Sequence, residues 1–308
     1  MTEQLKISAQ KRFATGLLLA IVGSIAFSGK AIIVKLAYRY GVDAITLIMY
    51  RMLFALPIFA VMAWWASRGK AALTRNDWLG VLGLGFTGYY LASYLDFAGL
   101  AYISAALERL ILYLNPTLVL ILGWLLYKKK MSSKQIGAMA LSYAGILLVF
   151  GHELKFDGAM GGLASSNTIV GAALVFGSAV SYAIYLSYSG EMVKRLGSLR
   201  LVGLATTVAC LLCIAQFAVL RPLSAMVVAP QVIWLSLLNA TLCTALPVLA
   251  VMMAIERIGA PLTAQTGMIG PMSTILMGVF ILGEPLNAWI IAGTVLVLGG
   301  VYWVSRKN

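Results

Sequence analysis

The sequence predicts an all-α integral membrane protein whose ten transmembrane helices form two inverted five-helix repeats, with both termini in the cytoplasm. Three observations predict this fold: the composition, an internal repeat and the distribution of basic residues. Of the 308 residues, 61% are hydrophobic and 11% are charged, and the mean hydropathy is +0.94. Soluble domains have about 45–50% apolar and about 25% charged residues. The chain is therefore expected in a lipid bilayer.

Apolar runs of about 20 residues, the length that crosses the hydrocarbon core as a helix, follow one another along the chain. Their number and spacing predict ten spans. In order, these are Phe13–Leu36, Ala44–Ala66, Trp78–Leu100, Ser104–Tyr127, Ser132–Gly151, Thr168–Ser189, Leu199–Leu220, Pro230–Ile255, Ala260–Leu282 and Leu286–Ser305.

The second half of the chain is a diverged copy of the first. A shift of 155 positions places Ile103–Tyr127 on Ile258–Leu282, and the match extends from about Asp77 to Val149. The residues in register include Ile103/Ile258, Ala105/Ala260, Pro116/Pro271 and Gly123/Gly278. We therefore divide the chain into repeats at 1–151 and 152–308. Five spans in each repeat is an odd number, so the second copy must cross the membrane in the opposite direction, as in many secondary transporters.

The basic residues lie mainly in alternate connectors, which predicts the orientation. One set of connectors contains Lys6, Lys11, Arg12, Arg68, Lys70, Arg75, Lys128, Lys129, Lys130, Lys134, Lys194, Arg195, Arg200, Arg257, Arg306 and Lys307, and the other contains Arg39, Lys155 and Arg221. Lys and Arg are enriched in cytoplasmic loops. This distribution accounts for the net charge of +13 without a nucleic-acid partner.

Several functional classes are disfavoured by what the sequence contains. Cys210, Cys213 and Cys243 lie in apolar runs, where packing is a simpler role than metal or redox chemistry. The single histidine, His152, is expected to be exposed in a polar connector. We predict no metal, no cofactor and no ATP-binding loop of the G-x-x-x-x-G-K-[ST] type. A transporter is favoured over the alternative classes, which are an intramembrane lipid-modifying enzyme and a channel.

Pro116 and Pro271 occupy equivalent positions in the middle of the fourth and ninth spans. A proline removes one backbone donor and leaves the carbonyl four residues earlier, Leu112 or Gly267, without its usual partner. We expect paired hinges or broken helices that expose polar backbone near the membrane midplane. The alternative is a packing kink, which is common in membrane helices.

Five charged residues are predicted inside spans of the first repeat, all in the outer third of the bilayer: Lys30, Arg51, Asp96, Glu108 and Arg109. Charged residues inside spans are costly and usually functional. Three interpretations remain open. The side chains could reach the interface or pair structurally, form an outer ion-pair gate, or make a cationic site for a substrate carboxylate.

Tyrosines and neutral polar residues far from the predicted interfaces are the candidates for a substrate cavity, because buried hydroxyl groups need hydrogen-bond partners. The candidates are Tyr89, Tyr90, Tyr94, Tyr113, Thr117, Tyr182, Tyr185, Asn239, Gln265 and Thr266. The alternative is hydrogen bonding between helices in a dry core.

The tandem five-span repeat, the segments LNPTLVLILG and IGPMSTILMG, the LGEP that follows the second of these, and the closing IIAGTVLVLGGVYW resemble the EamA-type ten-helix carriers of the drug/metabolite transporter superfamily. The resemblance extends to bacterial amino acid exporters, the aromatic amino acid branch included. It implies a multi-pass protein of the bacterial inner membrane that exports small amphipathic metabolites by alternating access. Sugar phosphates, nucleotide sugars and drugs are alternative substrates. The expected partners are a small-molecule substrate and the lipid bilayer, and a monomer is compatible with this function.

Overall fold

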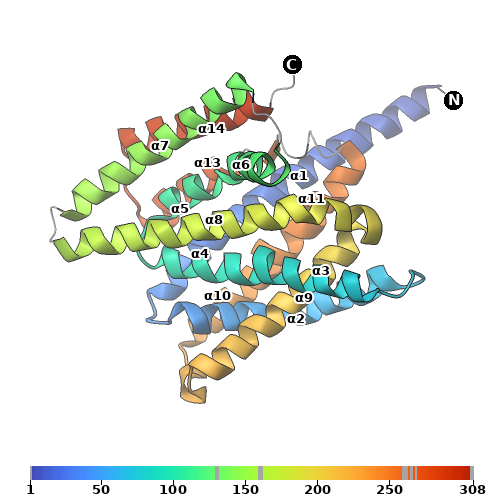
Figure 1. The fold of residues 1–308 in the computed structure, drawn as a ribbon, viewed down its shortest axis with the longest axis horizontal. Helices are drawn as coiled ribbons and strands as arrows, with labels where there is room; N and C mark the ends of the chain where they lie inside the picture. Colours follow the sequence, from blue (N-terminus) through green and yellow to red (C-terminus); the bar gives the residue numbers. More distant parts are fainter. Residues whose placement is uncertain are drawn as a thin grey trace.

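The computed structural model describes residues 2–128, 132–158, 162–258, 263, 266–267 and 269–305, and these form a bundle of helices (Figure 1). Seven helices are long and apolar enough to cross a membrane, and two shorter apolar helices cover Ile269–Leu282 and Ala288–Gly300. The continuous helical segment from Arg75 to Leu100 completes the ten predicted crossings. The ten-helix prediction is confirmed.

The elements follow the predicted spans closely. The first half contains α1 (Thr2–Tyr38), α2 (Ala44–Ser67), α3 (Arg75–Leu84), η1 (Gly85–Leu91), α4 (Ala92–Leu100), α5 (Ala105–Leu112), α6 (Asn115–Tyr127) and α7 (Ser133–Gly158). The second half contains α8 (Gly162–Leu196), α9 (Ser198–Leu220), η2 (Leu223–Met226), α10 (Pro230–Ala240), η3 (Thr241–Ala245), α11 (Leu246–Ile258), α13 (Ile269–Met277), η4 (Gly278–Leu282) and α14 (Ala288–Ser305).

The third and eighth spans each contain a π-helical turn, η1 and η3, which the sequence did not predict. The repeat offset places Gly85–Leu91 over residues 240–246, so the two turns occupy equivalent positions. π turns are rare and occur often at functional sites. Their duplication indicates that this backbone feature belongs to both halves of the fold.

The fourth span is broken where the proline predicts a break. The helix α5 ends at Leu112, and α6 starts again at Asn115 with Pro116 in its first turn, where the missing N–H is tolerated. Pro271 is the third residue of α13. Pro116 therefore lies at the beginning of a helical segment, and Pro271 lies inside the ninth span, where Thr266 and Gly267 are also helical.

Helices from the two halves of the chain interleave. The helix α1 packs along α11 and α13, α2 along α9, and α4 along α8, while α7 and α14 pair at the opposite edge of the bundle from α2 and α9 (Figure 1). The start of α1 and the α2–α3 and α8–α9 connectors lie toward the same side, on the right in Figure 1. We call this side the basic end of the bundle, because Arg68 and Lys70 lie in the α2–α3 connector, Arg75 begins α3, and Lys194 and Arg195 lie at the end of α8. The other side is called the opposite end.

Two local expectations need correction or comment. His152 lies inside α7 rather than in a polar connector, and it is half-buried, 6.1 Å from the Trp289 ring. At His152 the helix α7 still packs against the start of α14, through Trp289 and Asn287. The proposed division at 151/152 also falls within α7, and it stays a prediction.

The tryptophans Trp64, Trp65, Trp78, Trp124, Trp234, Trp289 and Trp303 are all exposed, as expected for residues that anchor a protein at membrane interfaces.

Candidate functional site

A cavity of about 530 Å³ lies among the helices in the middle of the bundle. Both π turns contribute to its wall, through Gly88 and Tyr89 of η1 and Thr244 of η3. The break before Pro116 contributes Asn115, and Gly267, four residues before Pro271, also lies in the wall. The cavity is therefore built where the helices of both halves are irregular and their backbone groups are open to other partners.

Tyrosine rings form one side of the cavity. Tyr89 and Tyr185 have ring centroids 5.2 Å apart and hydroxyl oxygens 3.2 Å apart, and Tyr182 stacks on Tyr185 at 5.4 Å. Tyr113 donates a hydrogen bond of 2.9 Å to the carbonyl of Gly267, which is the carbonyl that Pro271 leaves without a helical donor. Tyr113 thus joins the broken helix of one half to the proline segment of the other.

Four of the five predicted charged residues meet in one buried cluster beside the cavity. Lys30 Nζ lies 2.5 Å from Asp96 Oδ2 and 3.8 Å from Glu108 Oε1, and Arg109 Nε lies 3.8 Å from Glu108 Oε2. Arg109 also donates to Thr274 Oγ1 at 3.0 Å. We call Lys30, Asp96, Glu108 and Arg109 the ion-pair cluster. Its two cations and two carboxylates balance each other.

Arg51 lies apart from the ion-pair cluster. Its Nε and Nη2 atoms donate to Thr244 Oγ1 at 3.2 and 3.1 Å, and its guanidinium covers the Phe97 ring at 5.2 Å. Arg51 is 6% exposed and Glu108 is 0% exposed. The interpretation that these charged side chains reach the membrane interface is therefore wrong, because helices of the second half cover them.

The structure divides the predicted cavity residues into two groups. Tyr89, Tyr113, Tyr182 and Tyr185 line the cavity. Tyr90 and Tyr94 pack against the apolar core beside it, on a different face of the span from Tyr89, Ser93 and Asp96.

Three neutral candidates, Thr117, Asn239 and Thr266, also lie beside rather than along the cavity. Thr117 donates to the Leu114 carbonyl at 2.8 Å, and Asn239 Nδ2 donates to the Lys30 carbonyl at 3.5 Å. Thr266 is half-buried next to the lining residue Gly267. Gln265 lies outside the described residues.

Sequence reasoning missed several lining residues, including Phe27, Asn115, Ser178 and Val202. The Phe27 ring lies 5.8 Å from both Lys30 Nζ and the Arg109 guanidinium. The mid-span dipeptide Asn115-Pro116 was an available signal for Asn115. The sequence carried no comparable signal for Phe27 or Val202, which are ordinary apolar residues.

At the opposite end of the bundle, polar contacts join the two halves of the chain. Arg221 Nε donates to Asp43 Oδ1 at 3.2 Å, and Lys35 Nζ lies 3.8 Å from Glu284 Oε1. Partial burial disfavours the charged form of Asp43, but hydrogen bonds from Thr46 and the charge of Arg221 outweigh this effect and lower the pKa of the Asp43 carboxyl. The carboxylate is therefore ionised at neutral pH, as the contact with Arg221 requires.

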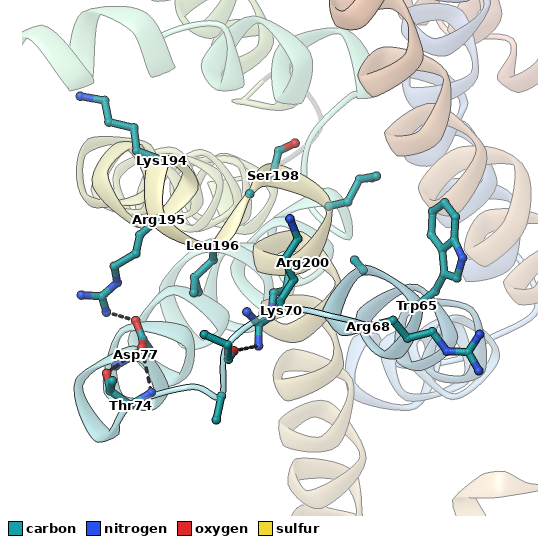
Figure 2. A pocket seen from close by; sticks show the side chains of 15 residues that line it. Trp65, Arg68, Lys70, Thr74, Asp77, Lys194, Arg195, Leu196, Ser198 and Arg200 are labelled. Carbon is teal, nitrogen blue, oxygen red and sulfur yellow. Dashed lines mark hydrogen bonds and ion pairs between the residues drawn. The ribbon is translucent and has the colours of Figure 1, made fainter.

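A second hollow, of about 920 Å³, opens at the basic end between the α2–α3 and α8–α9 connectors (Figure 2). Arg195 pairs there with Asp77, and Arg200 donates to Ser67 Oγ at 3.1 Å and to the Ala71 carbonyl at 2.9 Å. Lys194 and Lys70 add positive charge to its rim. These contacts hold the two connectors together, and the basic lining is typical of cytoplasmic loops.

Comparison with known proteins agrees with the fold. The EamA-like transporter family matches the chain twice, over residues 14–151 and 169–306. The uncharacterized transporter YcbK of Bacillus subtilis is 29% identical over 98% of this chain and 94% of its own length. An uncharacterized transporter of Archaeoglobus fulgidus is 24% identical over 96% of this chain and 98% of its own.

A solved crystal structure superposes with a TM-score of 0.62 at 15% identity, covering 94% of this chain and 97% of its own. That likeness supports the fold. Among the residues that the structure describes, no group of three or more His, Cys, Asp or Glu side chains could hold a metal ion. The two family matches cover most of the sequence, and the apolar helices place it in a membrane as a multi-pass protein: the chain belongs to the EamA-like transporter family.

Proposed function

We propose that this transporter exports small amphipathic metabolites, amino acids with aromatic or hydrophobic side chains among them, by alternating access. The observation that carries the proposal is the composition of the central cavity. Its wall combines the rings of Tyr89, Tyr182 and Tyr185 with the buried charges of Arg51 and Asp96. Apolar groups with a few placed polar groups are typical of small-molecule sites, and an amphipathic solute requires both.

The position of the cavity supports a path that is exposed to each side in turn. It lies between two halves that we take to be inverted repeats, next to the helix break before Pro116 and to Gly267, four residues before Pro271. In transporters with inverted repeats, substrate sites lie near the midplane at broken helices. We propose that the two proline segments are paired hinges and that the ion-pair cluster gates the path.

The wall of the cavity extends toward the basic end. Its lining reaches Ser189 of α8 and Val202 in the second turn of α9, both close to the α8–α9 connector. At the opposite end, Arg221 with Asp43 and Lys35 with Glu284 join the halves. This arrangement is expected of a conformation with access from the cytoplasm, given the orientation that the basic connectors predict.

The proposal is tested with purified protein in liposomes loaded with radiolabelled solutes. We expect saturable efflux of phenylalanine or leucine that exceeds the efflux from protein-free liposomes. The panel also contains hexose phosphates and lipophilic cations. Transport of a sugar phosphate or a cation without transport of any amino acid would overturn the substrate class.

Because the carboxylates of the ion-pair cluster are already paired with cations, we expect facilitated export, and accumulation driven by a pH gradient would contradict this.

The cavity residues are tested by replacing Tyr89 and Tyr185 singly with alanine. We expect each variant to lose about tenfold or more in transport rate, because each ring forms part of the wall that the apolar end of the solute contacts. Tyr102→Ala is the matched control, since Tyr102 is an exposed tyrosine at the end of α4. Unchanged transport in both cavity variants would mean that these rings belong to the protein core.

A further inference from the structure

Arg51 is a buried cation that forms no ion pair with the residues that the structure describes. It lies on the buried first half of α2, and its Nη1 atom has no hydrogen-bond partner among the described residues. The hydroxyl of Thr244 and the ring of Phe97 are its nearest polar and aromatic partners. A buried charge without a compensating group is strongly unfavourable. We therefore expect Arg51 to acquire an anionic partner when the transporter binds its substrate.

Asp96 has the complementary deficit. Its Oδ2 atom receives Lys30, but its Oδ1 atom is buried and has no hydrogen-bond partner among the described residues. Asp96 directly precedes Phe97, the ring that Arg51 covers, and α4 packs against α2. Both Arg51 and Asp96 line the central cavity. An unused donor on a cation and an unused acceptor on a carboxylate therefore occupy neighbouring parts of the cavity wall.

The ion-pair cluster cannot complete either group. Lys30 and Arg109 are each within 4.0 Å of a carboxylate, whereas no carboxylate of the described residues lies within 4.0 Å of Arg51; Glu108 also has both oxygens without a hydrogen-bond partner, but it does not line the cavity. Arg51 is therefore a third cation beside two cation–carboxylate pairs, so it leaves the cavity wall with a net positive charge. A mobile group that brings a negative charge to Arg51 and an N–H donor to Asp96 would satisfy both.

We infer that Arg51 and Asp96 recognise the charged head of a zwitterionic α-amino acid. This inference rests on the proposed function and names the groups that select its substrate. The carboxylate of the solute accepts hydrogen bonds from the Arg51 guanidinium, whose planar fork suits a carboxylate. Its ammonium group donates to Asp96 Oδ1. The side chain of the solute lies toward Tyr89, Tyr182 and Tyr185. Thr244 is a positioning residue, since it holds Arg51 through two hydrogen bonds.

The test uses three probes that share one side chain: L-phenylalanine, phenethylamine, which lacks the carboxylate, and 3-phenylpropionate, which lacks the ammonium group. Efflux of each from proteoliposomes is compared at equal concentration. We expect phenylalanine to be carried at least about tenfold faster than either analogue, because a site built for polar groups rejects solutes that leave those groups unpaired. Equal rates for the three probes would overturn the inference while the proposed function stands. If no probe is carried, the proposed function fails as well.

Arg51→Gln separates recognition of the carboxylate from a structural role. We expect phenylalanine efflux to fall about tenfold or more, while phenethylamine efflux changes little, so the preference between these probes is lost. Arg51→Lys keeps the charge but not the fork and should restore part of the preference. Arg68→Gln, at the exposed end of α2, is the matched control and should leave all three rates unchanged. An Arg51→Gln variant that keeps the full preference contradicts the inference, and the probe series in the unmodified protein remains decisive if that variant does not fold.

Discussion

The segment formed by α3, η1 and α4 and the segment formed by α10, η3 and α11 hold equivalent places in the two halves of the transporter. Both cross the bundle with a π turn at the same register, and both border the central cavity. Their side chains differ sharply. Tyr89 corresponds to Thr244 and Asp96 to Val251, so one segment supplies a ring and a charge where the other supplies a hydroxyl and an isopropyl group. The backbone frame is duplicated, and the chemistry of the cavity is not.

The largest effect is expected when Asp96 of the first half is replaced by valine, the residue that Val251 provides at the equivalent position of the second half. We expect the free energy of unfolding to fall by about 3–5 kcal/mol, because Lys30 then loses its closest anion in the interior. Thermal unfolding of the purified protein in detergent measures the loss.

The double variant Lys30→Met with Asp96→Val is the control for this test. Removing both charges leaves no unpaired cation at this position, so most of the lost stability should return. A single variant as stable as the unmodified protein would show that Lys30 depends on Glu108 and not on Asp96.

A second test addresses the π turn itself. Gly88 corresponds to Cys243, but a Cβ atom at Gly88 would overlap the Tyr185 ring. We expect Gly88→Ala to lower the free energy of unfolding by about 1–3 kcal/mol, because a packed ring and a helix would have to move apart. Thermal unfolding and the transport rate both report this change.

Gly83→Ala is the matched control in the same segment. A Cβ atom at Gly83 meets no atom within 4 Å, so its substitution should leave stability equal or slightly higher, as expected for alanine in a helix. Equal behaviour of the two variants would contradict the close packing of η1 on α8.

The smallest effect is expected from loss of the hydrogen bond between Tyr113, just before Pro116, and the carbonyl of Gly267, just before Pro271. Tyr113→Phe removes the donor to the Gly267 carbonyl, and we expect a loss of about 0.5–1.5 kcal/mol, because water in the cavity can replace part of the bond. Tyr102→Phe at an exposed position is the control. A transport rate that changes without a change in unfolding temperature would assign Tyr113 to the hinge motion.

The sequence was sufficient for the ten spans and for the break at Pro116, because apolar length and a mid-span proline are direct physical signals. It also indicated that Lys30, Asp96, Glu108 and Arg109 were important, since buried charges are rare in membranes. The pairing among them could not be predicted, because it depends on how α1, α4 and α5 pack. Tyr90 and Tyr94 lie outside the lining because they occupy a different face of the span from Tyr89, Ser93 and Asp96, and the sequence alone did not show which face borders the cavity.

The paired π turns also carry information about the origin of the molecule. A π turn is closed by i→i+5 hydrogen bonds, so it is a rare departure from regular helix that two unrelated segments would seldom share. The same register in η1 and η3 is explained most simply by one such turn in an ancestral half-length protein, before its gene was duplicated. The charges of Asp96, Glu108 and Arg109, which the second half lacks, then mark later divergence of two copies that already shared this turn.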